Sequence, residues 1–305
     1  MKYIFGPVPS RRLGLSLGID LIPPKTCTYD CLYCQVGKTR NKQVCQENFA
    51  PVTRVLTELK ETLEKSAPDA ITLAGSGEPT LHSEIDKIIA GIKDSTDTQI
   101  VLLTNGSLLW NEEIRKRIQG VDIIMPTLST VFEDTFRTIH RPHQDLRLPE
   151  VIRGIKTFRG EFHGLMYLEV VLLDGFNDSD KEIAGLKRVI DEISPDKVQL
   201  NTVVRPPSDP GARPLDRERL EYIKGLLGDK AEVIAGPPES RDGGEQDSPF
   251  ETVIEMARRR PVRVADIAKT LKMSLEETDR LVKGLLIKGR ISKQEHLGEN
   301  FFIVK

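Results

Sequence analysis

Three cysteines lie close together in one short segment near the start of the chain. The stretch "KTCTYDCLYCQ" spans residues 25–35 and contains Cys27, Cys31 and Cys34. Cys45 follows eleven positions later and is the last cysteine of the sequence. Thiolates bind soft metal ions, so these residues form either a closed four-thiolate structural site or a three-thiolate site with one open coordination position. An open position lets a substrate reach the metal, and a site of that kind is catalytic.

The spacing of the cysteines favours an iron–sulfur cluster over a zinc site. Structural zinc sites usually present two short pairs of ligands that are widely separated along the chain. Here the ligands form one triplet, C-x3-C-x2-C, and no histidine lies between Cys27 and Cys45. Such a triplet occupies three irons of a [4Fe–4S] cluster and leaves the fourth iron free. We therefore predict that Cys27, Cys31 and Cys34 bind this cluster; the alternative is a structural metal knuckle.

Cys45 is a candidate for a different role. As a fourth ligand it would block the open iron, so we predict that it lies outside the coordination sphere. Two alternatives remain for it. It is an ordinary loop or core thiol, or it is a catalytic thiol that donates or accepts a hydrogen atom.

Elements that position the cysteines follow a regular order up to about residue 235. Strand patterns alternate with helical patterns, which predicts a parallel sheet of six β/α units in an open or barrel-like form. Polar loops follow the strands, and right-handed crossovers bring them to one rim, where the function of β/α barrels lies. The expected strands are 15–22, 69–75, 98–106, 121–129, 165–175, 196–204 and 230–236, and the expected helices are 51–66, 83–94, 111–120, 133–140, 148–160, 178–194 and 215–229.

The end of the chain has a different character. Residues 236–248 are rich in Gly, Pro and charged residues without apolar periodicity, which predicts a linker. Residues 249–305 read as three helices followed by a two-stranded hairpin, the order of a winged helix. We therefore expect a barrel domain over residues 1–235, a linker over 236–248 and a small winged-helix domain over 249–305.

Composition sets broad limits on the class of protein. The chain has 305 residues, of which 30% are charged and 38% hydrophobic, with a formal net charge of only −2. These values are typical of a globular protein, and no apolar run reaches the roughly 18 residues that a membrane span needs. The first residues lack the apolar stretch of a signal peptide. We therefore expect a cytoplasmic protein without a membrane partner, in which crowded cysteines bind metal rather than form disulfides.

The cysteine triplet resembles the signature of radical S-adenosylmethionine (radical SAM) enzymes. It follows the first expected strand of a β/α repeat region, and Tyr33 is the aromatic residue before the last cysteine. "AGSGEPTL" after the next strand resembles that superfamily's Gly-Gly-Glu motif. The resemblance covers about residues 14–235. "FGPVPSRRLGLSLGID" and "NTVVRPP" are similar to the group that contains the wyosine-forming tRNA enzymes.

The sequence departs from that group in one respect. The archaeal wyosine-forming enzymes are expected to carry a second cysteine set for an additional cluster. This chain has no cysteines left to build one, which counts against the specific wyosine reaction.

The resemblance implies a fold, cofactors and a reaction. The fold is a partial (β/α)6 TIM-like radical SAM barrel. The free iron of the cluster binds the amino and carboxylate groups of SAM, and an electron, which a flavodoxin- or ferredoxin-type donor supplies, breaks the C5′–S bond. The resulting 5′-deoxyadenosyl radical abstracts a hydrogen atom from the substrate. The resemblance assigns cofactor binding to Tyr33, Gly75, Ser76, Gly77, Glu78, Asn105, Asn177, Asn201 and Val203.

Signals for the substrate are weaker than those for the cofactor. Arg205 is a candidate for a substrate or SAM-carboxylate contact, with a structural salt bridge as the alternative. "FRTIHRPHQDLRL" over residues 136–148 is either a phosphate or carboxylate grip or a solvated helix end. The mildly basic winged helix indicates either RNA or protein docking. RNA modification is the first hypothesis, and radical modification of a protein, a peptide or a small metabolite is the alternative.

A hypothesis of another class is an iron–sulfur sensor that regulates transcription through the winged helix. It explains a cluster beside a module of DNA-binding type. It does not explain the "GSGEP" motif or the β/α repeats. Glu276 and Glu277 also lie at the start of the expected recognition helix, where base contacts are made, and their charge opposes DNA binding.

Overall fold

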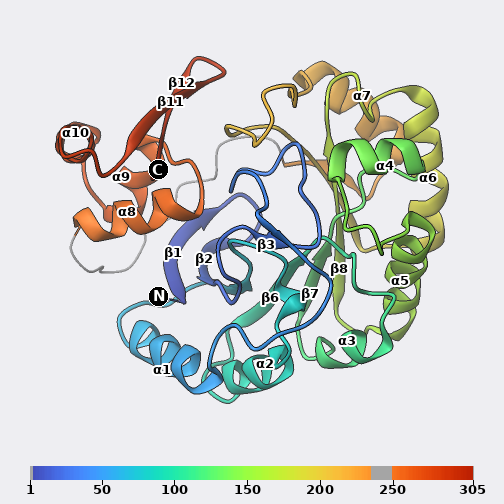
Figure 1. The fold of residues 1–305 in the computed structure, drawn as a ribbon, viewed down its shortest axis with the longest axis horizontal. Coiled ribbons are helices and arrows are strands. Elements are labelled where there is room, and N and C mark those ends of the chain that lie inside the picture. The colour runs from blue at the N-terminus through green and yellow to red at the C-terminus, as the bar shows by residue number, and fades with distance from the viewer. Residues whose placement is uncertain (1–2, 235–248, 305) are drawn as a thin grey trace.

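The computed structural model describes residues 3–234 and 249–304. The predicted linker, residues 236–248, lies outside the described residues. The chain forms one large sheet with its helices, followed by residues 249–304, which we call the C-terminal unit (Figure 1).

The large sheet contains eight strands in the order β1-β2-β5-β6-β7-β8-β9-β10. Strands β2 to β10 of this sheet pair in parallel, in chain order, as the alternating pattern predicts. Their carboxyl ends therefore share one rim. The strands are β1 (Ile4–Ser10), β2 (Gly14–Ile19), β5 (Ala70–Leu73), β6 (Gln99–Thr104), β7 (Ile123–Pro126), β8 (Leu165–Leu172), β9 (Lys197–Thr202) and β10 (Ala231–Val233).

Strand β1 is the strand of the large sheet that the sequence pattern did not predict. It pairs antiparallel with β2, and its sequence, "IFGPVPS", contains a glycine and two prolines. Proline cannot donate to a sheet ladder and is tolerated at sheet edges, which is the position that β1 occupies. A pattern rich in Gly and Pro indicates a loop when the pairing partner is not known.

Among the described residues, seven helices accompany the large sheet. They lie along its outside in Figure 1. Side chains of the central strands are buried, and Leu17, Leu73, Leu102, Leu168 and Leu200 have almost no exposed surface. These leucines belong to the core between the sheet and the helices. None of the described helices is both long and apolar enough to cross a membrane. The helices are α1 (Val52–Leu63), α2 (Ile85–Lys93), α3 (Glu112–Arg117), α4 (Glu133–His140), α5 (Leu148–Glu161), α6 (Asp180–Ile193) and α7 (Arg217–Leu227).

The C-terminal unit has its own apolar core. Val253, Ile267, Val282 and Phe302 are buried in it, and Val8 of β1 joins the same cluster. The unit therefore packs against the edge of the large sheet, beside β1 (Figure 1). Its elements occur in the predicted order: α8 (Pro249–Arg259), α9 (Val264–Leu271), α10 (Leu275–Ile287), β11 (Ser292–His296) and β12 (Glu299–Ile303), of which the last two pair antiparallel.

Polar contacts reinforce the joint between the C-terminal unit and the sheet. Arg205, after β9, forms an ion pair of 3.2 Å with Asp266 of α9 and donates a hydrogen bond of 2.6 Å to the carbonyl of Pro261. His296 lies 3.1 Å from the carbonyl oxygen of Val203. Burial acts to raise the pKa of Asp266, but Arg205 and Arg263 outweigh it and lower the pKa to about 2.

This low pKa predicts that the Asp266 contact loses its stabilising effect in acid. A carboxyl group whose pKa falls on folding stabilises the fold above its unfolded pKa, and that contribution disappears as the pH falls from about 4 towards 2. We expect Asp266→Asn to lower the free energy of unfolding by about 2 kcal/mol at pH 7. Urea unfolding of both proteins between pH 7 and pH 3 measures this. A difference between them that stays constant over this range would contradict the assignment.

Candidate active site

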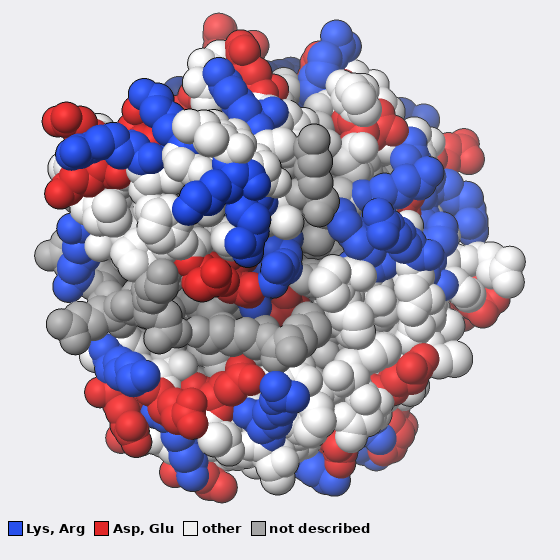
Figure 2. Space-filling view, turned by 60° about the vertical axis from the view of Figure 1, so that its left-hand side comes forward, with Lys and Arg blue, Asp and Glu red and all other residues white. Residues whose placement is uncertain are grey.

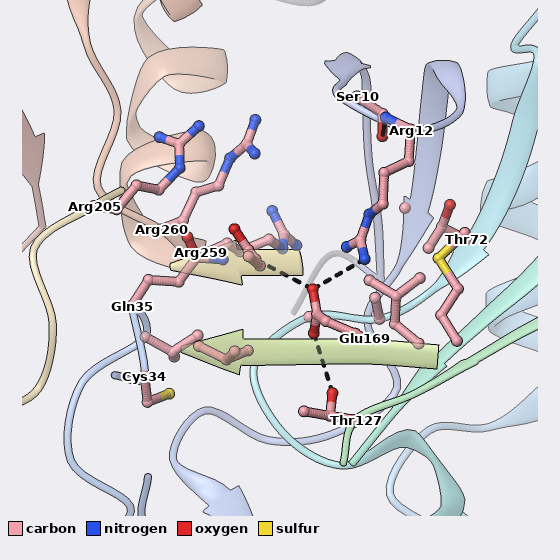
Figure 3. Close-up of a pocket in the computed structure, with 18 of the residues that line it drawn as sticks. Ser10, Arg12, Cys34, Gln35, Thr72, Thr127, Glu169, Arg205, Arg259 and Arg260 are labelled. Atoms are coloured by element: carbon pink, nitrogen blue, oxygen red, sulfur yellow. Dashed lines mark hydrogen bonds and ion pairs between the residues drawn. The ribbon is translucent and has the colours of Figure 1, made fainter. Parts of the chain in front are cut away.

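A cavity of about 410 Å³ opens at the carboxyl ends of the parallel strands. Its wall is formed by the β1–β2 hairpin, the cysteine loop, the ends of β5, β6, β8 and β9, and the end of α8. Figure 3 shows this wall. The volume lies in the usual range for a small-molecule or cofactor site. The cavity therefore lies at the carboxyl ends of the strands, where the sequence pattern predicts the active site.

All three predicted cluster ligands line this cavity. Cys27 ends the short strand β3 (Thr26–Cys27), which pairs with β4 (Asn41–Lys42), and Cys31 and Cys34 follow in the loop. The loop is held from two sides. The backbone N–H of Leu32 donates to the carbonyl of Ile139 at 2.9 Å, and the hydroxyl of Ser208 donates to the carbonyl of Cys31 at 2.7 Å.

The chemistry of the thiols fits metal binding rather than nucleophilic catalysis. Burial and the nearby Glu78 raise the pKa of Cys27 to about 12, and burial also raises the pKa values of Cys31 and Cys34. A nucleophilic cysteine needs a lowered pKa, whereas a coordinating thiol loses its proton to the metal. Backbone N–H groups bond to the sulfur atoms of Cys27 and Cys34, an arrangement that tunes iron–sulfur clusters.

The spread of the donors suits a cluster better than a single ion. Within residues 3–234 and 249–304, no three His, Cys, Asp or Glu side chains are grouped closely enough to hold one metal ion. In a [4Fe–4S] cluster each thiolate binds a different iron atom, so the ligands stand further apart than around one ion. A set of three half-buried thiols in the wall of one cavity therefore fits the cluster.

Cys45 lies away from this cavity. Its side chain is exposed, and the residue is not part of the cavity wall. It follows β4, and its carbonyl accepts a hydrogen bond of 3.0 Å from the side chain of Gln43. The structure therefore does not bring Cys45 to the residues that form the site, and the catalytic role predicted for it has no geometric support.

The glycine motif after β5 packs tightly against the strand that carries Cys27. A Cβ atom on Gly77 would lie 1.9 Å from the carbonyl oxygen of Thr26, which only a glycine allows. Gly75 has φ +151°, and a Cβ atom there would lie 2.3 Å from the carboxyl carbon of Asp20. Both glycines line the cavity, so the backbone of this loop is open to a ligand.

Ser76 and Glu78, the polar residues of the motif, are engaged by neighbouring groups. Ser76 donates from its N–H and its hydroxyl to Asp20, at 3.0 and 2.6 Å, and does not line the cavity. Buried Glu78 accepts hydrogen bonds from Thr80, from the hydroxyl of Thr104 and from the N–H of Asn105 at 2.7 Å. Burial raises the pKa of Glu78, and these donors oppose the shift.

Asn105 links the glutamate to the cysteine loop. Its side-chain amide donates to the hydroxyl of Thr28 at 2.7 Å and lies 3.6 Å from the sulfur of Cys27. Glu78, Asn105 and Cys27 therefore form one connected chain of contacts along the cavity wall. The sequence predicted both Asn105 and Glu78 for this site.

The structure places His140 against the cysteine loop, a contact that sequence reasoning missed. Its Nδ1 lies 3.3 Å from the sulfur of Cys31 and 3.3 Å from the hydroxyl of Tyr33, which lines the cavity. Burial lowers the pKa of His140 to about 3, so the ring is neutral. The aromatic rings of Tyr29 and Phe136 pack against the imidazole and hold it in place.

The structure does not bring the charged side chains of residues 136–148 together around His140. Of the three arginines in that segment, Arg137 forms an ion pair with Glu133 at 2.7 Å, and Arg141 forms one with Asp209 at 2.7 Å. Arg147 donates to the backbone carbonyls of Gln144 and Leu146. With His140 buried beside Cys31, these side chains do not converge on a common ligand. The signal for the buried role is the apolar spacing of α4, in which His140 follows Phe136 by one helical turn.

Asn201 near the end of β9, and Val203 and Arg205 just after it, line the cavity. Asn201 accepts a hydrogen bond of 3.2 Å from Arg11 and donates one of 3.2 Å to Glu169. Arg205 also makes the ion pair with Asp266, which was the structural alternative for it.

The structure does not bring Asn177 to the cavity. Asn177 is fully buried, and its amide group donates to the carbonyls of Ser129 and Val171 and accepts from the N–H of Leu173. Both N–H groups and the oxygen of its side-chain amide are therefore hydrogen-bonded to backbone groups that hold the loop after β8. A polar residue in a strand-end loop resembles a ligand contact in sequence, although here it is a structural support.

Glu169 is a further residue that the sequence reasoning missed. It lies inside β8 and bonds to Arg12 at 3.0 Å, to Asn201 at 3.2 Å and to Thr127 at 3.1 Å, as Figure 3 shows. A single carboxylate in the apolar run "LMYLEVVL" is a usable signal, because a buried charge needs partners.

Comparisons with known proteins agree with this geometry. The sequence matches the family profile "Radical SAM superfamily" over residues 21–186. It is 32% identical over 313 residues to UPF0026 protein MJ1312 of Methanocaldococcus jannaschii, a match that covers 99% of this chain and 96% of that protein. A protein named GTPase Obg from Brachyspira hyodysenteriae is 36% identical over 297 residues, which cover 96% of this chain and only 44% of that protein.

Solved structures show the same fold at low sequence identity. A radical SAM methyltransferase from Sphaerobacter thermophilus superposes with a TM-score of 0.57 at 19% identity, over 72% of this chain and 66% of that one. TYW1 with a bound lysine-pyruvate adduct gives a TM-score of 0.51 at 15% identity, over 73% of this chain and 75% of that one.

The chain therefore belongs to the radical SAM superfamily, and it is an enzyme. Membership implies a [4Fe–4S] cluster, SAM and a reductant. The residues that line the cavity fit these groups, since three thiols and a glycine-rich loop share one wall.

Proposed function

We propose that this enzyme modifies RNA by abstracting a hydrogen atom. In this proposal the fold is a partial (β/α)6 barrel with a winged-helix domain, and the enzyme belongs to the group that contains the wyosine-forming tRNA enzymes. Cys27, Cys31 and Cys34 hold the cluster, and a flavodoxin- or ferredoxin-type protein supplies electrons in the cytoplasm. When bound, the cluster delivers the electron that cleaves SAM to the 5′-deoxyadenosyl radical, which takes hydrogen from the substrate.

One observation carries the proposal of radical chemistry. The cysteine triplet and the glycine motif come from different β/α units and line the same cavity. The chain's own residues then have distinct tasks. Gly75 and Gly77 expose backbone to the methionyl end of SAM, and Glu78 fixes Asn105 beside Cys27.

The wall of the cavity also serves to exclude water. Tyr33 and Val203 contribute to a small apolar cluster over the cysteine loop, in which Leu32 and Ile139 are buried. A radical intermediate reacts with what is near it, so a site that excludes water and side reactants favours the intended hydrogen transfer. We assign cofactor contact to Tyr33, Asn105, Asn201 and Val203 from their place in this wall, and a supporting role to Ser76 and Asn177.

RNA is the first candidate for the substrate because the cavity wall is rich in arginine and the C-terminal unit borders it. The surface of that unit does not present one continuous basic field. Figure 2 turns this side of the molecule forward and shows groups of Lys and Arg with Asp and Glu between them. A surface of mixed charge suits contacts with a few phosphate groups. Binding along duplex DNA favours a continuous basic surface instead.

A protein substrate is the second candidate, and exposed apolar residues favour it. Ile287 at the end of α10 is 87% exposed, and Leu297 in the hairpin turn is 62% exposed. A contiguous exposed apolar surface marks a protein contact site, whereas single exposed side chains are common, so a protein substrate ranks second. A small metabolite remains the third alternative.

The transcriptional sensor is opposed by the first turn of α10. Glu277 caps this helix together with Ser274, and Glu276 lies beside it. Lys283, further along, is paired with Asp279 at 2.5 Å. Negative charge at the end of the helix that would enter the groove repels DNA phosphates.

Mass spectrometry of nucleosides from cells with and without the gene tests the proposal. We expect one modified nucleoside to disappear with the gene and to return with the wild-type gene, but not with Cys27→Ala. Purified enzyme with SAM and dithionite should then restore it on RNA from the deleted strain and release 5′-deoxyadenosine. Unchanged RNA beside an altered protein or metabolite would reject RNA as the substrate, and duplex DNA binding that followed cluster oxidation would favour the sensor.

A further inference from the structure

Among residues 3–234 and 249–304, five arginines and two carboxylates line the cavity. The two acids are Glu78 and Glu169. The arginines come from three parts of the chain that are distant in sequence: the hairpin between β1 and β2, the segment after β9 and the end of α8. They are Arg11, Arg12, Arg205, Arg259 and Arg260.

Three of these arginines have carboxylate partners. Arg12 pairs with Glu169 at 3.0 Å, and Arg205 pairs with Asp266 at 3.2 Å. Arg259 lies 3.5 Å from Asp20 and 2.8 Å from Glu255. Each of the three guanidinium groups therefore has a carboxylate close by, and the contact of Arg259 with Asp20 joins α8 to the large sheet.

Arg11 and Arg260 differ from the other three. Among residues 3–234 and 249–304, neither forms an ion pair with a carboxylate. Arg11 donates only to neutral oxygens, of Asn201 at 3.2 Å and of the Ile234 carbonyl at 3.1 Å. Asp266 and Glu169 attract these groups from a distance, but both acids are engaged by other arginines.

Both of these arginines remain charged at neutral pH. Burial and the neighbouring arginines lower the pKa of Arg11 to about 10 and that of Arg260 to about 9. Each guanidinium group thus keeps its proton while it is crowded by like charges. Both side chains are half-buried, and a bound anion would supply the ion-pair partner that each of these charges lacks among the described residues.

We propose that Arg11 and Arg260 together bind a phosphate group of the substrate. A guanidinium group offers parallel N–H donors that match the oxygens of phosphate. A phosphate group has enough oxygen atoms to accept from both arginines, whether it is a singly charged phosphodiester of RNA or a doubly charged terminal phosphate. The inference rests on the proposed function, because it names the group by which the substrate is held in the radical site.

The position of this anchor fits a substrate that lies beside the cofactor. Figure 3 shows Arg205, Arg259 and Arg260 on one side of the cavity, across from Glu169 and with Cys34 on the same wall. Arg260 belongs to the C-terminal unit and Arg11 to the first hairpin, so the anchor exists only when that unit is packed on the sheet. The C-terminal unit is then part of the substrate site as well as a candidate docking module.

Calorimetric titration of the full-length, anaerobically reconstituted enzyme with inorganic pyrophosphate tests the anchor. We expect Arg11→Gln and Arg260→Gln each to weaken binding about tenfold or more, since each removes charged hydrogen bonds. Arg260→Lys, which keeps the charge, should retain part of the affinity. Arg258→Gln is the matched control, because Arg258 is the neighbouring arginine on α8, pairs with Glu255 and does not line the cavity. Melting curves of each variant exclude misfolding as the cause.

Competition identifies the source of the phosphate. Displacement of pyrophosphate by RNA, or by AMP alone, supports the anchor, and AMP alone would at the same time reject RNA as the substrate. Displacement by SAM would overturn the proposal, because the arginines would then serve the SAM carboxylate. Equal pyrophosphate affinity in all variants would also overturn it. Pyrophosphate binding is measured without turnover. The enzyme can therefore form 5′-deoxyadenosine even if Arg11 and Arg260 bind no phosphate, and it can bind phosphate even if it forms no 5′-deoxyadenosine.

Discussion

Replacing Cys27, Cys31 or Cys34 with alanine should abolish the iron–sulfur cluster and the cleavage of SAM. Each variant loses one of three thiolates that act as a unit in the cavity wall, so we expect 5′-deoxyadenosine formation to fall by about a thousandfold or more. Iron and sulfide analysis, the visible absorption of the cluster and chromatography of the products measure the effect.

Cys45→Ala is the matched control for these variants. Cys45 is exposed and lies outside the cavity wall, so the variant should keep the full cluster content and the full yield of 5′-deoxyadenosine. Loss of the cluster in Cys45→Ala would reject the three-thiolate assignment. Loss of substrate turnover with normal SAM cleavage would instead restore the catalytic role predicted for this thiol.

Gly77→Ala should disrupt the site although it removes no ligand. The added methyl group would lie 1.9 Å from the carbonyl oxygen of Thr26 and 2.5 Å from a methyl carbon of Ile22, so the strand that carries Cys27 must move. Overpacking of this kind costs about 3 kcal/mol or more when backbone is involved. We expect a lower free energy of unfolding, measured with urea, and a lower cluster content after reconstitution.

Gly225→Ala provides the control for the glycine change. Gly225 lies near the end of α7, has nothing within 4 Å of an added Cβ atom and is exposed. Alanine at such a helical position should leave the cluster intact and stabilise the fold by about 0.5–1 kcal/mol. If Gly77→Ala behaved like this control, the close approach between the glycine motif and the cysteine strand would be refuted.

The parallel sheet was predictable because its strands and helices alternate with clear periodicity. Every predicted strand of the sheet is present, with its ends within a few residues of the expected ones. The site at the carboxyl ends follows from that topology alone. The cysteine spacing adds the chemistry, since the three thiols come from one loop and need no tertiary information to be grouped.

Contacts between distant segments were beyond what the sequence indicates. Nothing local places Arg260 of the C-terminal unit beside Arg11 of the first hairpin, which lie 249 positions apart in the numbering. For His140 and Asn177, too, the local sequence indicated a role that differs from the contacts in the structure. The sequence around His140 indicated a surface grip, but the side chain is buried beside Cys31. The position of Asn177 indicated a ligand contact, but its amide supports a loop.

Electron–nuclear double resonance of the reduced cluster tests the central claim most directly. The enzyme is mixed with SAM that carries ¹⁷O in the carboxylate and ¹⁵N in the amino group. An iron left open by Cys27, Cys31 and Cys34 predicts coupling of both labelled atoms to the cluster, in the wild type and in Cys45→Ala alike. Bound SAM without coupling from either atom, on a fully reduced cluster, would contradict the open iron site.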